Sequence, residues 1–233
     1  EGPNQSKSVV PQSALKVFTS RPQSDSIRHS WDFESGSGST AFDGQNSANL
    51  TLHDMNSSNW VSCPGGTCLF FDGVDDYAQV DVQDWSGNLT ISQFVLVEDD
   101  NQTEYASTFA IDSTAGSSQS FQHMIQNGDW KQHSNSSNVI GQLKLHQWNH
   151  LSTVYDNGTV HRYMNGIHVG SFQPNSSDFN NVDVYRLGVN RAGSAFYKGF
   201  IDKVVVYDDA LSHEEVHQLS REVYKNCGPF SGA

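Results

Sequence analysis

Basic residues, cysteines and long apolar runs are all scarce in this chain of 233 residues. It has 13 lysines and arginines against 26 aspartates and glutamates, which gives a formal net charge of −13. Nucleic acid and anionic membranes are therefore not expected as partners, because both are bound by clustered basic residues. No apolar run approaches the roughly 20 residues that a membrane-spanning helix needs. The sequence predicts no membrane span.

The motifs of several enzyme classes are also missing. The chain has no Gly-x-Ser-x-Gly elbow, no phosphate-binding loop and no paired metal-binding cysteines. Residues 213–217 match the His-Glu-x-x-His zinc motif, with two histidines on one helix face. We reject zinc there, because no histidine follows His217 and Glu222 is too close to be the usual third ligand. These absences favour a protein that is not an enzyme.

The few cysteines indicate an oxidising compartment. Cys63 and Cys68 bracket Pro64-Gly65-Gly66-Thr67, a turn-forming segment, which predicts a small local disulfide. Cys227 is left over, either as a free thiol or as an intermolecular link. No secretion signal is visible, and Glu1 is interpreted as a mature or trimmed end.

Asparagine glycosylation motifs are the stronger sign of secretion. Eight Asn-x-Ser/Thr sequons occur, where random placement would give roughly three. Most lie beside turn residues, as expected of surface loops. The chain is therefore predicted to be an extracellular glycoprotein. The predicted acceptors are Asn4, Asn49, Asn56, Asn88, Asn101, Asn135, Asn157 and Asn175.

Residues 27–233 have the pattern of one all-β domain, with short alternating runs between Gly, Asn, Asp and Ser clusters. Asn157-Gly158 and Asn165-Gly166 predict two hairpin turns within a three-strand meander over Leu151–Phe172. Ser212 with Glu215 predicts a capped helix near the C-terminus. Residues 1–26 form a separate arm rich in Ser, Gln and Pro, and Ala14–Thr19 alternates like a strand. The arm is either a flexible leader or a strand that pairs with a sheet edge of this chain or of a neighbour.

Six motifs in order and spacing carry a family resemblance over about residues 27–225. They are Trp31-Asp32-Phe33-Glu34, Leu69–Tyr77, Leu89-Thr90-Ile91-Ser92, Trp148-Asn149-His150-Leu151, Tyr155–Gly166 and Gly199–Tyr207, the last leading into Ala210-Leu211-Ser212. In this register they resemble the laminin-G-like jelly-roll domain of the concanavalin-A-like lectin/glucanase superfamily. The resemblance implies a two-sheet antiparallel sandwich with one short C-terminal helix. Large aromatic side chains are expected to anchor its core, namely Trp31, Phe33, Phe71, Trp148 and Tyr207.

The resemblance also implies a structural Ca²⁺ ion. Its ligands in relatives come from an N-terminal carboxylate loop and from an Asp near the start of the last long strand. The matching residues are Glu34, Asp43 and Asp202. Ca²⁺ takes six to eight oxygen ligands, so backbone carbonyls of the Gly/Ser-rich loop would have to contribute. The alternative is that these carboxylates cap turns or lie in water.

Relatives that hydrolyse β-glucans carry Glu-x-Asp-x-x-Glu on a strand, which sets two carboxylates side by side. Here Glu98 begins a similar run, but Thr103 occupies the third position and Glu104 comes one residue late. The segment is interpreted as a solvated loop. A glycosidase is therefore not expected.

Sugar binding without catalysis is a hypothesis that the residues leave open. Lectin sites place an aromatic face against the apolar side of a sugar, with polar groups for its hydroxyls. Tyr105, His123 and Trp130 are the candidates, with Gln126 and Asn127 nearby. The alternative is that Trp130 is a core or strand-edge aromatic.

Two functions from different classes follow. The first is a non-catalytic structural or adhesive unit that binds copies of itself, by exchange of the 1–26 arm into head-to-tail filaments. The single domain, the strand-like arm and the leftover Cys227 favour it. The alternative is a lectin-like module that binds extracellular glycans.

Overall fold

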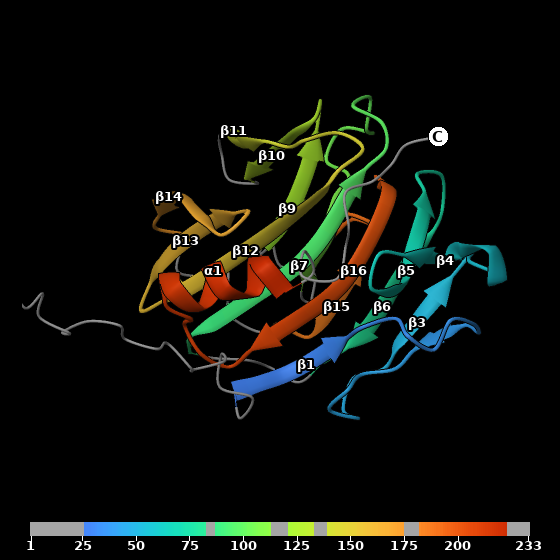
Figure 1. Cartoon of the computed structure of the whole chain (residues 1–233), viewed down its shortest axis with the longest axis horizontal. Coiled ribbons are helices and arrows are strands. Elements are labelled where there is room, and N and C mark those ends of the chain that lie inside the picture. The colour runs from blue at the N-terminus through green and yellow to red at the C-terminus, as the bar shows by residue number, and fades with distance from the viewer. Residues whose placement is uncertain (1–25, 83–86, 113–120, 133–138, 175–181, 223–233) are drawn as a thin grey trace, which may run out of the picture.

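Two antiparallel β-sheets pack face to face, and one short α-helix lies on the outside (Figure 1). The computed structural model describes residues 26–82, 87–112, 121–132, 139–174 and 182–222. The arrangement is the all-β sandwich that the sequence predicts. Within the described residues, no helix has the length and apolar character needed to cross a membrane.

Sheet A contains the longest strands. Its members are β1 (Ile27–Trp31), β4 (Trp60–Cys63), β5 (Gly66–Asp72), β7 (Leu89–Val97), β12 (Trp148–Asp156), β13 (Thr159–Met164), β14 (Ile167–Phe172) and β16 (Lys198–Tyr207). Their order is β14-β13-β12-β7-β16-β5-β4, and β1 pairs with the second half of β16. A 3-10 helix, η2 (Ser57–Asn59), leads into β4.

Sheet B forms the second layer. Its strands are β2 (Thr40–Ala41), β3 (Leu50–His53), β6 (Tyr77–Asp81), β8 (Ser107–Asp112), β9 (Phe121–Gln126), β10 (Asp129–Gln132), β11 (Val139–Gln142) and β15 (Val184–Leu187). The order is β11-β10-β9-β8-β15-β6-β3-β2. Most strands of this sheet pair with a strand that is adjacent in the chain, because short hairpins join antiparallel strands.

The main core lies between the sheets, because alternate residues of each strand point inward. Trp31, Phe33 and Phe71 are buried there, as expected. Burying a large apolar side chain contributes about 1.5–3 kcal/mol. Trp148 and Tyr207 are buried as well, but in two smaller clusters on the outer face of sheet A. The expectation that these five aromatics anchor buried cores is therefore confirmed, although they belong to three separate clusters.

The predicted meander and helix are both confirmed. In the two hairpins, Asn157, Gly158, Asn165 and Gly166 all have positive φ. Asn and Gly adopt that conformation most readily, which is why these pairs form the tight turns between β12, β13 and β14. Helix α1 (His213–Glu222) begins after Ser212, whose Oγ accepts the amide N–H of Glu215 while the Glu215 carboxylate accepts from the amide of Ser212.

Helix α1 covers one part of the outer face of sheet A (Figure 1). Its Val216 and Leu219 pack against Val154 of β12 and Tyr163 of β13. Apolar residues at positions 216 and 219 fall on one helix face, because residues three apart are neighbours on a helix.

Candidate functional site

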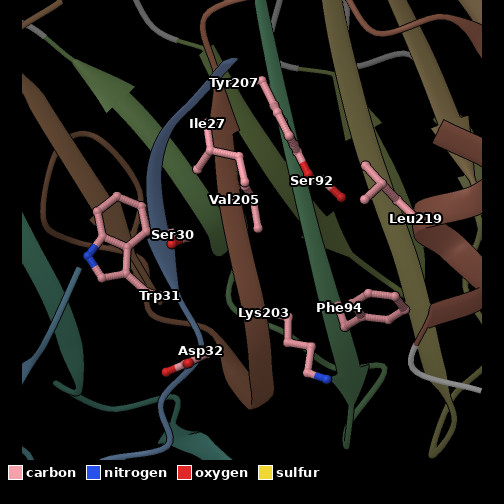
Figure 2. A pocket seen from close by; sticks show the side chains of 10 residues that line it. All are labelled: Ile27, Ser30, Trp31, Asp32, Ser92, Phe94, Lys203, Val205, Tyr207 and Leu219. Atoms are coloured by element: carbon pink, nitrogen blue, oxygen red, sulfur yellow. The ribbon is translucent and has the colours of Figure 1, made fainter. Parts of the chain in front are cut away.

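A hollow lies on the outer face of sheet A, between α1 and β1 (Figure 2). We call it the α1–β1 groove. Its volume is about 230 Å³. Apolar side chains form much of it, and the two charged residues lie toward one end (Figure 2). The lining residues are Ile27, Ser30, Trp31, Asp32, Ser92, Phe94, Lys203, Val205, Tyr207 and Leu219.

An irregularity in β16 directs Lys203, the one basic residue of this lining, into the groove. The pairing of β16 with β7 shifts register between Asp202 and Val205. Lys203 lies in that bulge with a φ of 48°, and its amide N–H donates to Asp202 Oδ1 at 2.8 Å. Bulges redirect side chains in this way. The Lys203 side chain extends along the groove on the side of Phe94, and Asp32 lies across from it on the chain after β1 (Figure 2).

A buried polar pair lies beneath the groove. Ser92 Oγ is 2.8 Å from Nε2 of His150, and the rings of Phe94 and His150 are 4.8 Å apart. His150 is fully buried, and burial lowers its pKa to about 3. The imidazole is therefore neutral at neutral pH, since a buried charge without compensation is costly. It supports the wall of the groove without adding charge to it.

A second hollow lies nearer the other end of β7, and we call it the Trp148 hollow. Its volume is about 250 Å³. It combines aromatic rings with one carboxylate and one imidazole. The lining residues are Val61, Ser62, Cys63, Pro64, Leu96, Glu98, His146, Trp148 and Phe200.

The two hollows follow one another along β7. Ser92 and Phe94 line the groove and Leu96 lines the Trp148 hollow, so alternate β7 residues serve both. Four strand residues span roughly 13 Å, a length that suits an extended oligosaccharide better than a single small molecule. Phe94 and Trp148 also belong to one buried cluster, which joins the two hollows.

The two hollows offer apolar walls and a few polar groups. The described lining of each hollow contains one carboxylate, Asp32 in the groove and Glu98 in the Trp148 hollow. Glycoside hydrolysis by the usual route needs two carboxyl groups about 5–9.5 Å apart on either side of the bond. Aromatic rings with a few polar groups are instead typical of binding sites.

The predicted calcium ligands are placed in two different surroundings. The Asp43 carboxylate is buried and accepts N–H groups of Ser30, Gln45, Ser47 and Ala48, with His29 Nδ1 at 3.0 Å. Burial alone would raise the pKa of Asp43, but these hydrogen bonds lower it to about 2. Asp43 thus anchors the 43–48 loop to β1, as in the turn-capping alternative.

Glu34 and Asp202 belong to the other surroundings. Burial raises the pKa of Asp202 to about 7; the charge and the amide of Lys203 oppose this rise, and the charges of Glu34 and Asp32 add to it. Glu34 Oε2 also accepts the amide N–H of Thr67 at 3.2 Å. Concentrated negative charge of this kind is what a cation would relieve. In the described part of the chain, however, three candidate ligand atoms come within 4.8 Å of one another only at Asp72, Asp75 and Asp76. Ca²⁺ at Glu34 and Asp202 stays a prediction.

Two of the three predicted sugar contacts lie in the interior. Trp130 and His123 are fully buried between the sheets, with ring centroids 5.2 Å apart. Burial, followed by the charges of Arg162 and His150, lowers the pKa of His123 well below its usual value. The structure selects the core alternative for Trp130, because a buried ring offers no face to a sugar. Tyr105 is 38% exposed, in the loop before β8, and so does not join the other two at a surface.

The predicted disulfide is present between Cys63 and Cys68. It closes the β4–β5 hairpin beside the Trp148 hollow. Four of the described sequon asparagines are exposed and a fifth, Asn88, is partly exposed, so all five lie at the surface. The exposed ones are Asn49, Asn56, Asn101 and Asn157. Asn4, Asn135, Asn175, Cys227 and residues 1–25 of the arm lie outside the described residues, and occupancy of every sequon stays a prediction.

Sequence reasoning missed the groove because its residues come from four elements that only the sheet brings together. β1 and β16 are more than 160 positions apart in the chain yet pair directly. The bulge that redirects Lys203 has no visible sequence signal. One signal was available: Ser92, Phe94 and Leu96 alternate along a strand, which places them on one face.

Three comparisons with known proteins bear on the fold. A family model described as the concanavalin A-like lectin/glucanases superfamily matches residues 72–217. No curated protein sequence matches the chain. Two similar solved structures are each less than 25% identical to this chain, so their likeness shows the fold alone.

Both structures are from secreted or glycan-acting enzymes. Domain 4 of AbnA, an extracellular arabinanase from Geobacillus stearothermophilus solved with arabinotriose, is 21% identical with a TM-score of 0.60, over 83% of this chain and 98% of that chain. Trypanosoma rangeli sialidase is 14% identical with a TM-score of 0.64, over 84% of this chain and 33% of that chain. The present chain therefore spans about a third of the sialidase.

Proposed function

Because the chain belongs to the concanavalin A-like lectin/glucanase superfamily, we propose that it is a non-catalytic extracellular module that binds glycans along β7 on the outer face of sheet A. The observation that carries this proposal is the alignment of the α1–β1 groove and the Trp148 hollow along one strand. Laminin-G-like domains and disulfides are typical of extracellular proteins. The exposed sequons support secretion in the same direction.

The linings match the two faces of a sugar. Phe200, which is partly exposed, presents aromatic carbon to the apolar side of a ring, while Glu98 and His146 offer hydrogen bonds to hydroxyl groups. In the groove, Lys203 donates and Asp32 accepts. Each ring of a bound oligosaccharide would thus meet an apolar wall and at least one charged group.

Hydrolysis is not proposed, because the lining of each hollow contains one carboxylate and the usual route needs two. The match to the arabinanase domain covers 98% of that chain, and that domain was solved in complex with arabinotriose. A single sandwich is therefore large enough to bind such a ligand. Linear pentose oligosaccharides are accordingly the first probes.

Glycan-array screening followed by calorimetry with arabinotriose and the best array ligand tests the proposal. Phe200→Ala removes an aromatic wall, and Lys203→Asn removes the charge while keeping a residue that tolerates positive φ. Each is expected to weaken affinity about tenfold, or about 1.4 kcal/mol. Ile167→Ala, an exposed change on β14, is the matched control and leaves affinity unchanged. Silence across the array, or equal losses in all three variants, would refute the proposal.

Self-assembly is the second proposed function, and the strand-like segment Ala14–Thr19 supports it. In the described part of the chain, β14 and β4 are at the ends of the sheet A order and β11 and β2 at those of sheet B, where a strand could be added. Light scattering on the full chain and on a chain lacking residues 1–26 separates the alternatives. Polymers that vanish on deletion support assembly, whereas two identical monomers contradict it. Neither result depends on glycan binding.

A further inference from the structure

Four of the ten histidines meet on the outer face of sheet A, at its β14 side. Two of them contact Tyr163, whose ring centroid lies 5.2 Å from that of His168 and 5.7 Å from that of His213. His161 is 5.8 Å from His168, and His217 is 6.4 Å from His213. Three elements, β13, β14 and α1, therefore contribute imidazoles to one surface patch.

Two of these imidazoles converge on one atom. Ser171 Oγ lies 2.7 Å from Nδ1 of His161 and 2.8 Å from Nε2 of His168. The pairing of β13 with β14 sets this geometry, because His161 is opposite Ser171 and Tyr163 is opposite His168. A hydroxyl has one proton to donate, so it can donate to one ring and accept N–H from the other. One ring nitrogen of each histidine therefore faces the same oxygen atom.

Helix α1 adds the third imidazole. The pKa of His168 is lowered by burial and next by the charges of His161 and His213, so the three rings are electrostatic neighbours. His168 and His213 are exposed and have room to rotate. His217 has less room, because its Nδ1 lies against Gly166. The zinc motif at residues 213–217 has no third ligand nearby in the sequence. In the fold, His161 of β13 and His168 of β14 are available as further ligands to the metal.

We propose that His161, His168 and His213 form a binding site for Zn²⁺. Zinc takes imidazole nitrogens at about 2.0–2.1 Å in a tetrahedral arrangement, and water would complete the four ligands. In the described structure the nitrogens of these residues are not gathered within 4.8 Å, so the ion draws them together by rotating exposed side chains. The ion takes the place that Ser171 Oγ holds between the first two rings. The site is independent of glycan binding.

The chemistry of the ligands sets the selectivity. Imidazole favours Zn²⁺ and Cu²⁺, whereas Ca²⁺ and Mg²⁺ prefer oxygen ligands. Cu²⁺ is expected to bind more tightly than Zn²⁺, in keeping with the usual order of divalent affinities. Binding should be lost at pH 5, where protons compete for the ring nitrogens.

Calorimetry with ZnCl₂ on the untagged full chain at pH 7.5 tests the site. One saturable binding event is expected, and His168→Gln should weaken it at least about tenfold. Ser171→Ala removes the bridging hydroxyl but no proposed ligand and should retain binding. His53→Gln, a histidine that stacks on Tyr77 in another part of the sandwich, is the matched control.

Three results would overturn the site. They are no saturable Zn²⁺ binding at pH 7.5, equal affinity in wild type and His168→Gln, or an equal loss in His53→Gln. His168 and Ser171 are exposed, whereas His161 and His53 are partly buried. Circular dichroism of each variant checks that the fold is kept. His161→Gln provides a second, independent ligand deletion.

Discussion

The buried His150 makes a specific contribution to the pH dependence of stability. Its imidazole is fully buried, is 2.8 Å from Ser92 Oγ and packs on Phe94. Burial lowers its folded-state pKa from 6.5 to about 3. Between these values the unfolded chain binds a proton that the folded chain does not. The folded state therefore loses stability as the pH falls through this window.

The magnitude follows from the width of the window. Each pH unit below 6.5 costs about 1.4 kcal/mol, so lowering the pH to 5 costs about 2 kcal/mol. Other groups add to the total: His123 acts in the same direction, while Asp202 and Asp76, whose pKa values are raised to about 7 and about 6, act in the opposite one. The difference between wild type and a variant cancels those contributions.

Urea unfolding of wild type and His150→Gln at pH 8 and pH 5 measures the effect. At pH 8 the variant is less stable, because it loses packing and the contact with Ser92. At pH 5 the gap should shrink by about 2 kcal/mol, because only wild type has the buried histidine. Ser92→Ala is the matched control: it loses the same hydrogen bond but keeps the imidazole, so its gap should stay constant. A His150→Gln gap that is equal at both pH values would refute the reasoning.

Two further predictions concern the carboxylates near β1. Asp43→Asn should cost about 2 kcal/mol of unfolding free energy at pH 7, because the pKa of Asp43 is lowered from 3.8 to about 2 in the folded state. This difference should vanish as the pH falls to 2. Chemical denaturation measures it, and an unchanged unfolding midpoint at pH 7 would contradict the prediction. Ca²⁺ at pH 8 should raise the melting temperature if Glu34 and Asp202 hold the ion, and Asp202→Asn should abolish the rise. Equal melting curves of wild type in Ca²⁺ and in EDTA would remove this site.

Several features were determined by local sequence. Asn157-Gly158 and Asn165-Gly166 form the predicted turns because positive φ is easiest for these residues. Ser212 and Glu215 cap α1 through reciprocal hydrogen bonds between positions three apart. Cys63 and Cys68 pair because a short hairpin keeps them together. Each of these depends on residues that are close in the chain.

The tertiary structure alone decided which side chains meet. Trp130 and His123 point between the sheets and not into solvent, because strand register sends alternate residues to opposite faces. Asp43 binds the amides of its own loop, while Glu34 and Asp202 become neighbours across the β5–β16 side of sheet A. His168 and His213 both contact Tyr163 only because α1 packs across β13. Sequence by itself determined the sandwich and its turns, whereas pairing over long chain separations determined the groove and the histidine patch, since no local pattern encodes which distant strands become neighbours.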